Sequence, residues 1–202
     1  MKINYRIFQK NKMTEFEINL KQHFGIIDAK ELKSVASLFK PEILKKGELL
    51  LETGKKCDKF CFIQSGFLRV FLETHNKQVT QWISSQGYFV TDLSGFIFDK
   101  PSRWMIEALT DTRIYTLNKS QYKKINAIVP QWPELEKQFI IHCFTTLENR
   151  IFSHLSMTAE ERYQFFFEHN KELFNQVPLQ YIASMLGMTP ETFSRIRKKQ
   201  QL

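Results

Sequence analysis

The most constraining feature of this sequence is the segment 178–202, in which two short amphipathic stretches meet at Gly187. Glycine tolerates the left-handed backbone of a tight turn between helices, and the small Ala183 permits two helices to cross closely. Thr189 is a good N-cap and Pro190 suits the first turn of a helix, so the second helix has a marked start. The segment therefore predicts two helices joined by a tight turn.

Each of the two predicted helices has an apolar and a polar face. On the second helix, Glu191, Ser194 and Arg195 share the polar side at helical spacing. The inward apolar positions are Ile182, Leu186, Met188, Phe193 and Ile196. Such a helix fits the DNA major groove, where arginine can donate to guanine as a fork and glutamate can accept from cytosine. The pattern by itself also fits a helical hairpin packed on a core, with its basic end in solvent.

The charge of the chain is compatible with DNA binding. The formal net charge is +8, and within 178–202 four basic residues stand against one acidic residue, a net +3. Surplus positive charge suits a protein that neutralises phosphates, and it equally serves solubility.

Several function classes lack their signatures. Cys57, Cys61 and Cys143 form no Cys-x-x-Cys pair, so we expect no disulfide framework, no metal site and no cofactor. No phosphate loop, nucleophile elbow or His-Glu-x-x-His motif is present, so we do not expect an enzyme. Without a long apolar run or a secretion signal, we expect a cytoplasmic protein that does not contact membranes.

The first part of the chain changes character near residue 40. Over 14–38, Phe16, Leu20 and Phe24 recur at helical spacing and Asp28 caps a second short helix, which predicts a helical cover. Nineteen phenylalanines then favour strands, and turn residues separate short β-prone runs at even spacing, which predicts a small barrel or double-sheet roll. The runs are 48–51, 59–63, 67–72, 79–83 and 112–117.

Helical periodicity dominates after residue 118. A short helix is predicted over 119–128, a long helix over about 133–154, and a further helix over 158–171 with a capping box from Thr158 to Glu161. The long helix carries a wide apolar stripe, which indicates a dimer seam together with contacts to the roll. Burial wholly within one subunit is the alternative. The predicted dimer-helix residues are Leu135, Phe139, Cys143, Leu147 and Ile151.

This order of parts resembles the family of the catabolite activator and the fumarate-nitrate regulator, which are bacterial transcription factors. The segment 182–195 is similar to the helix-turn-helix signature of that family, and 46–48, 63–66 and 86–89 resemble its roll. The resemblance implies an α+β fold with an N-terminal cyclic-nucleotide-binding-like β-roll, a long dimerisation helix and a C-terminal winged-helix-like helix-turn-helix domain. The implied divisions are 1–130, 131–156 and 157–202.

The family's recognition helix reads bases through an Arg-Glu-x-x-x-Arg set, and this chain matches it in part. Glu191 and Arg195 carry over as base contacts, and Ser194 is a further candidate. Pro190 replaces the first arginine and has no donor, so at least one base preference should differ. The residues placed for phosphate contact are Thr189, Gln180, Arg197, Lys198 and Lys199.

The corresponding cyclic-nucleotide pocket matches less well. Thr91 stands where the family has a glycine, Asp92 is one methylene shorter than the expected glutamate, and Ser102 and Arg103 are transposed. A one-residue shift on a strand turns a side chain to the opposite face. We therefore expect Asp92, Ser102 and Arg103 to form a degenerate pocket that does not bind cyclic AMP.

The sequence predicts a homodimeric regulator that reads a palindromic site in double-stranded DNA. Its roll would then be a degenerate sensor or a platform for RNA polymerase or another protein. The alternative is a regulator gated by a cyclic nucleotide or another small molecule bound in the roll, so the existence of an effector stays open.

Overall fold

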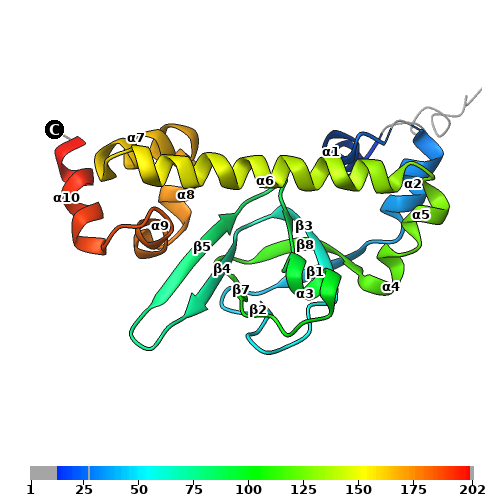
Figure 1. Cartoon of the computed structure of the whole chain (residues 1–202), viewed down its shortest axis with the longest axis horizontal. Helices are drawn as coiled ribbons and strands as arrows, with labels where there is room; N and C mark the ends of the chain where they lie inside the picture. Colours follow the sequence, from blue (N-terminus) through cyan, green and yellow to red (C-terminus); the bar gives the residue numbers. More distant parts are fainter. Residues whose placement is uncertain (1–12, 27, 201–202) are drawn as a thin grey trace, which may run out of the picture.

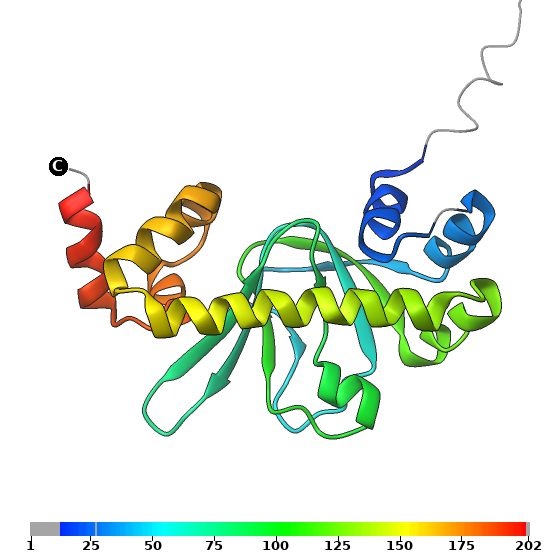
Figure 2. The same ribbon diagram turned by 45° about the horizontal axis from the view of Figure 1, so that its top comes forward.

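One long helix organises the molecule. In the computed structural model, which describes residues 13–26 and 28–200, helix α6 (Trp132–Ser156) runs along almost the whole length of the molecule (Figure 1). A β-roll lies beneath its middle, the N-terminal helices lie at one end, and the C-terminal helices lie at the other. The view turned by 45° shows α6 crossing one face of the roll (Figure 2). The predicted α+β class, with a roll and a long helix, is confirmed.

The roll consists of two four-stranded antiparallel sheets, with strand orders β1-β8-β3-β6 and β2-β7-β4-β5. The five predicted β-prone runs correspond to β2–β5 and β8. The strands β1, β6 and β7 were not predicted. β1 is an edge strand that contains Pro41 and buries only Leu44, so it lacks apolar alternation. The strands are β1 (Lys40–Leu44), β2 (Leu49–Leu51), β3 (Lys59–Ser65), β4 (Leu68–Glu73), β5 (Gln78–Ser84), β6 (Phe89–Val90), β7 (Met105–Ala108) and β8 (Thr112–Asn118).

The N-terminal helices form the predicted cover. Helix α1 (Glu15–Phe24) starts with a capping box from Thr14 and buries Phe16, Leu20 and Phe24, and Asp28 caps helix α2 (Ala29–Ala36). The ring of Phe24 lies 4.8 Å from that of Trp132 at the start of α6, which joins the cover to the long helix.

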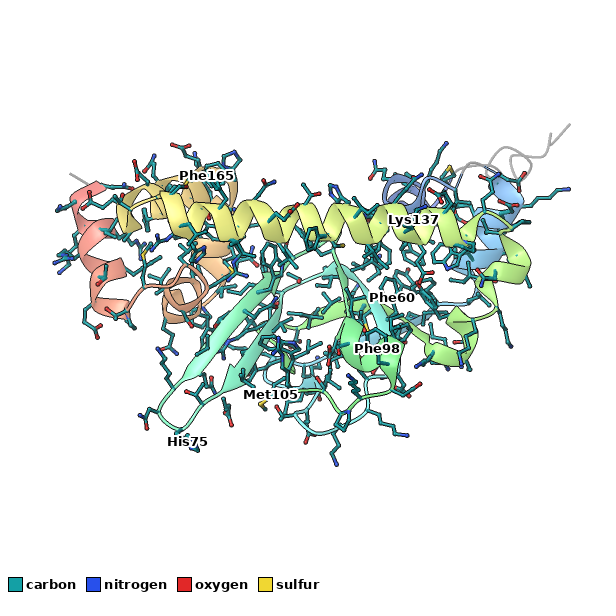
Figure 3. All side chains as sticks on the ribbon, viewed as in Figure 1. Phe60, His75, Phe98, Met105, Lys137 and Phe165 are labelled. Atoms are coloured by element: carbon teal, nitrogen blue, oxygen red, sulfur yellow. The ribbon has the colours of Figure 1, made fainter. Side chains whose placement is uncertain are left out.

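Aromatic side chains fill the space between α6 and the roll. The ring centroids of Phe60 and Phe89 lie 5.1 Å apart, and the Phe139 ring lies 5.8 Å from Phe89. Figure 3 shows Phe60 beneath the long helix. Leu135 packs on the same core, so the first half of the predicted apolar stripe is used within one subunit. Two short helices, α4 (Lys119–Tyr122) and α5 (Ile125–Ile128), lead from the roll into α6.

The C-terminal helices form a second apolar core around Phe193. Helix α7 (Ala159–His169) begins with the predicted capping box of Thr158, but the predicted helix 158–171 breaks at Asn170, where φ is −138°. The residues described within 157–200 include helices and no strand, so the wing of the predicted winged-helix-like domain is not among them. The remaining helices are α8 (Lys171–Gln176), α9 (Leu179–Met185) and α10 (Pro190–Gln200).

Over the ranges that the structure describes, no helix is both long and apolar enough to span a membrane.

Candidate functional site

The turn between α9 and α10 depends on Gly187, whose φ is +70°. The backbone N–H of Met188 donates to the Ala183 carbonyl oxygen over 2.9 Å, which closes the end of α9. The Thr189 hydroxyl oxygen then accepts from the Thr192 N–H over 3.2 Å and caps α10. The predicted pair of helices and their tight turn are therefore present.

Helix α10 presents its charged side to solvent. Phe193 and Ile196 are buried against the second core, whereas the predicted base-contact residues Glu191, Ser194 and Arg195 are exposed. Those three line one surface recess together with Lys198 and Lys199. Hydrogen bonds from its own backbone N–H and from Thr189 hold the pKa of Glu191 below its usual value. Glu191 is therefore an ionised acceptor at neutral pH, as a contact to a base amino group requires.

The other predicted phosphate contacts lie around this face. Gln180 at the start of α9 and Thr189 at the turn are both exposed. Lys199 pairs with Glu160 of α7 over 2.8 Å. Arg197 is half-buried on the side of α10 that faces the core, where its charge acts on Tyr163. The structure thus groups Glu191 and Ser194 with most of the basic residues and leaves Arg197 apart.

Helix α9 is fastened to the roll by contacts that sequence reasoning missed. The Ser184 hydroxyl oxygen accepts from the Thr80 N–H over 2.9 Å. Arg150 of α6 donates both to the Met185 carbonyl oxygen, over 2.9 Å, and to the Gln81 carbonyl oxygen. The helix α9 and strand β5 are therefore joined by direct and bridged hydrogen bonds.

A buried arginine completes this junction. The Arg69 side chain is 1% exposed and lies between the rings of Phe71 and Tyr181, at 4.0 Å and 3.7 Å. Its Nε donates to Thr80 over 3.0 Å, and Glu107 lies 3.7 Å away. We call Arg69, Tyr181, Thr80 and Ser184 the clasp. Only the unusual position of an arginine within the apolar run 67–72 could have signalled it.

The three predicted effector residues differ in their exposure and in their hydrogen-bond partners. Asp92 is buried at the start of helix α3 (Leu93–Phe98), which was not predicted. The Ser102 hydroxyl donates to the Trp104 carbonyl oxygen and accepts from the Trp104 N–H. Arg103 is exposed, with its guanidinium 4.6 Å from the Trp104 ring centroid. Within the described chain, no hydrogen bond or ion pair joins these three side chains.

The comparison with protein families gives one match, which falls on the roll and the short helices that follow it. Residues 41–127 are similar to the family described as the cyclic nucleotide-binding domain. No curated protein sequence matches the chain.

The whole chain is similar in structure to bacterial regulators. It matches FixK2 from Bradyrhizobium japonicum with a TM-score of 0.69 and 19% identity, over 81% of this chain and 84% of FixK2. A mutant of CooA from Carboxydothermus hydrogenoformans matches with a TM-score of 0.63 and 19% identity, over 94% of this chain and 86% of CooA. The catabolite activator protein of Thermus thermophilus gives a TM-score of 0.55 and 18% identity, over 88% of this chain and 85% of that protein. The resemblance to the catabolite activator and fumarate-nitrate regulator family is confirmed at the level of the fold.

Proposed function

We propose that this chain is a DNA-binding transcription regulator that acts as a homodimer on a palindromic operator and is not gated by cyclic AMP. The observation that carries the proposal is the exposed face of α10. There an ionised carboxylate, a hydroxyl and three basic side chains share one recess. This set of groups suits DNA, since bases offer donors and acceptors and phosphates attract cations.

The roles divide along the helix. Glu191 and Arg195 read bases, with Ser194 between them, while Lys198 and Lys199 contact phosphate. Thr189 and Gln180 at the helix starts add phosphate contacts that fix the register. Arg197 is a weaker phosphate contact than predicted, because its side chain is half-buried against the core.

The dimer is built along α6. On the side of α6 away from the roll, large apolar side chains recur at intervals of three and four residues and remain exposed, which is the spacing of a helix pair. They are Ile140, Phe144, Leu147, Ile151 and Leu155. Leu147 and Ile151 of the predicted seam are exposed, whereas Leu135 and Phe139 pack on the roll and the half-buried Cys143 lies between the two groups. A two-fold dimer would place its recognition helices on half-sites roughly 34 Å apart.

The proposed organisation keeps the three divisions of the chain. The described residues of the division 1–130 form the sensor-like roll with its cover, 131–156 the dimerisation helix, and those of 157–202 the DNA-binding part. The clasp joins the first and third divisions, so the roll also positions α9 and the start of the recognition helix. The exposed surface of the roll leaves room for RNA polymerase as a protein partner.

The base-contact assignment is tested by Arg195→Ala. An operator is first selected from random DNA, and its affinity is then measured by fluorescence anisotropy. Loss of one bidentate contact should cost about 1–3 kcal/mol. Arg113→Ala, which removes an exposed arginine from β8, is the control and should bind as the wild type does. Unchanged affinity of a folded Arg195→Ala protein would remove Arg195 from the site.

Independence from cyclic AMP is tested by titration calorimetry on the full chain. We expect no saturable heat at micromolar cyclic AMP, because Arg103 stacks on Trp104 and Ser102 is hydrogen-bonded within the chain. Saturable binding that Arg103→Ala abolishes would instead establish the alternative, a roll that binds a cyclic nucleotide.

A further inference from the structure

A cavity of about 490 Å³ lies at the junction of the roll and the C-terminal helices. Its walls come from the end of β5, the second half of α6, helices α7 and α8, and the end of α9. Figure 3 shows Phe165, one of its lining residues, on α7 beside this end of α6. The volume is within the range of about 300–1,000 Å³ that organic ligands occupy in proteins.

The cavity is distinct from the degenerate pocket in the roll and from the exposed face of α10. No residue of the degenerate pocket at 91–103 lines it, and neither does any residue of α10. Each residue of a helix turns by about 100°, so Asn149 and Ser153 point roughly 120–180° away from every apolar residue of the proposed dimer seam. A partner helix packed along the dimer seam would therefore leave these wall residues uncovered.

The chemistry of the walls selects the ligand. Most of the lining is apolar or aromatic, including Trp82, Phe166 and Leu173. The charged side chains are two arginines, Arg150 and Arg162, and no aspartate or glutamate contributes to the lining. The site therefore combines a large apolar surface with uncompensated positive charge.

The two guanidinium groups lack an anionic partner. Arg162 donates to the carbonyl oxygens of Met157 and Leu186, over 2.7 Å and 3.2 Å, and Arg150 donates likewise to carbonyl oxygens. Neither arginine forms an ion pair with any residue in the described ranges. Burial lowers the pKa of Arg150, and no nearby carboxylate opposes this effect. An anion in the cavity would supply the missing countercharge.

We propose that this cavity binds an amphipathic organic anion, with its acid group at Arg150 and Arg162 and its apolar body against Trp82, Phe166 and Leu173. The ligand contacts the roll, the long helix and the C-terminal helices at once. It thereby stabilises the arrangement in which the clasp holds α9 against β5.

The proposal is tested with two fluorescent probes of nearly the same shape. The anion 8-anilinonaphthalene-1-sulfonate and its neutral analogue N-phenyl-1-naphthylamine are titrated into the full chain, and decanoate is then added as competitor. We expect the anion to bind more tightly than the neutral probe and decanoate to displace it. Because no DNA is present, the result is independent of the proposed DNA binding.

Two variants locate the site. Ser153→Trp fills the cavity and should abolish displaceable binding of both probes. Asn149→Asp places a carboxylate on an exposed wall position. It should lower the affinity for the anionic probe by about fivefold and leave the affinity for the neutral probe unchanged. Gln138→Trp, which adds the same bulk on α6 away from the cavity, is the control and should bind as the wild type does.

Two outcomes would overturn the proposal. One is wild-type anion binding by a Ser153→Trp protein with a native circular dichroism spectrum. The other is equal affinity for the two probes in the wild type together with no effect of Asn149→Asp, which cannot disturb the core because Asn149 is exposed.

Discussion

At the scale of single residues, Gly187 determines whether helix α10 can follow α9 through a tight turn. Its φ of +70° is a conformation that side chains with a Cβ adopt only with strain. A Cβ at this position would also lie 3.4 Å from Cδ2 of His154 on α6. The turn is thus constrained both by its own backbone and by the long helix that packs beside it.

Gly187→Ala should destabilise the protein by about 1–2 kcal/mol, because alanine pays the cost of the left-handed backbone. The free energy of unfolding can be measured by urea denaturation. Gly187→Asn is the matched variant, since asparagine tolerates this conformation better while its Cβ still contacts His154. We expect Gly187→Asn to lower the free energy of unfolding less than Gly187→Ala does. A Gly187→Ala protein as stable as the wild type would contradict the role of the turn.

At the scale of elements, the clasp explains how α9 is held in place. Arg69 lies on the outer face of β4, and its neighbours Phe71, Thr80 and Tyr181 come from two strands and one helix. Burying an arginine is costly unless its donors and its charge find partners; here Thr80 and Gln78 accept hydrogen bonds and the Glu107 carboxylate lies 3.7 Å away. The junction is therefore specific for the arrangement in which α9 lies on β5.

Arg69→Met should lower the free energy of unfolding by about 2 kcal/mol, because it leaves the buried Thr80 hydroxyl without its donor and removes the bond to Gln78. Urea denaturation provides the measurement. Arg113→Met on the exposed side of β8 is the control and should change stability by less than about 0.5 kcal/mol. Equal effects of the two substitutions would show that the clasp does not stabilise the fold.

At the scale of the whole molecule, α6 serves both the subunit and the proposed dimer. Its roll-facing side buries Trp132 and contacts the core through Phe139, whereas Ile151 and Leu155 are 61% and 81% exposed. Exposed apolar side chains in a continuous row are typical of an interface rather than of a free surface. One wide stripe thus supplies both the contact with the roll and the apolar row of the proposed dimer seam.

Ile151→Asp should convert the proposed dimer into a monomer, because dimerisation would bury an unpaired carboxylate. Sedimentation velocity gives the oligomeric state, and operator affinity should fall by roughly tenfold or more, a change of about 1.4 kcal/mol. Gln138→Asp is the control: it places the same charge on α6, roughly 140° around the helix from Ile151, and this protein should remain dimeric. A dimeric Ile151→Asp protein would place the seam elsewhere.

Much of the fold was predictable because its signals are local. The capping boxes at Thr14 and Thr158, the buried stripe of α1 and the turn at Gly187 each depend on residues within a few positions. The edge strand β1 and helix α3 were missed because they lack such local signals. Their sequences lack strong periodicity, and their conformations depend on pairing with β8 and on packing beneath Cys57, where a Cβ on Gly95 would lie 3.0 Å from the Cys57 Cβ.

The exposed polar face of α10 was also foreseeable, since Glu191, Ser194 and Arg195 follow helical spacing. Which basic residues accompany them could not be foreseen. Arg197 is half-buried beside the second core, which also buries Phe193, whereas Lys198 is exposed and lines the recess. The electrostatic effect of Arg197 on Tyr163, 34 positions away in the chain, leaves no trace in local periodicity.

The sequence by itself determined the elements: a helical cover, a β-roll, a long helix and a helical pair with a charged outer face. These follow from propensity, capping and apolar period, which act over a few residues. The tertiary structure alone decided how they meet, including the clasp, the division of the α6 stripe and the cavity with its two arginines. Those features join residues far apart along the chain, such as Arg69, Arg150 and Tyr181, and only packing brings such residues together.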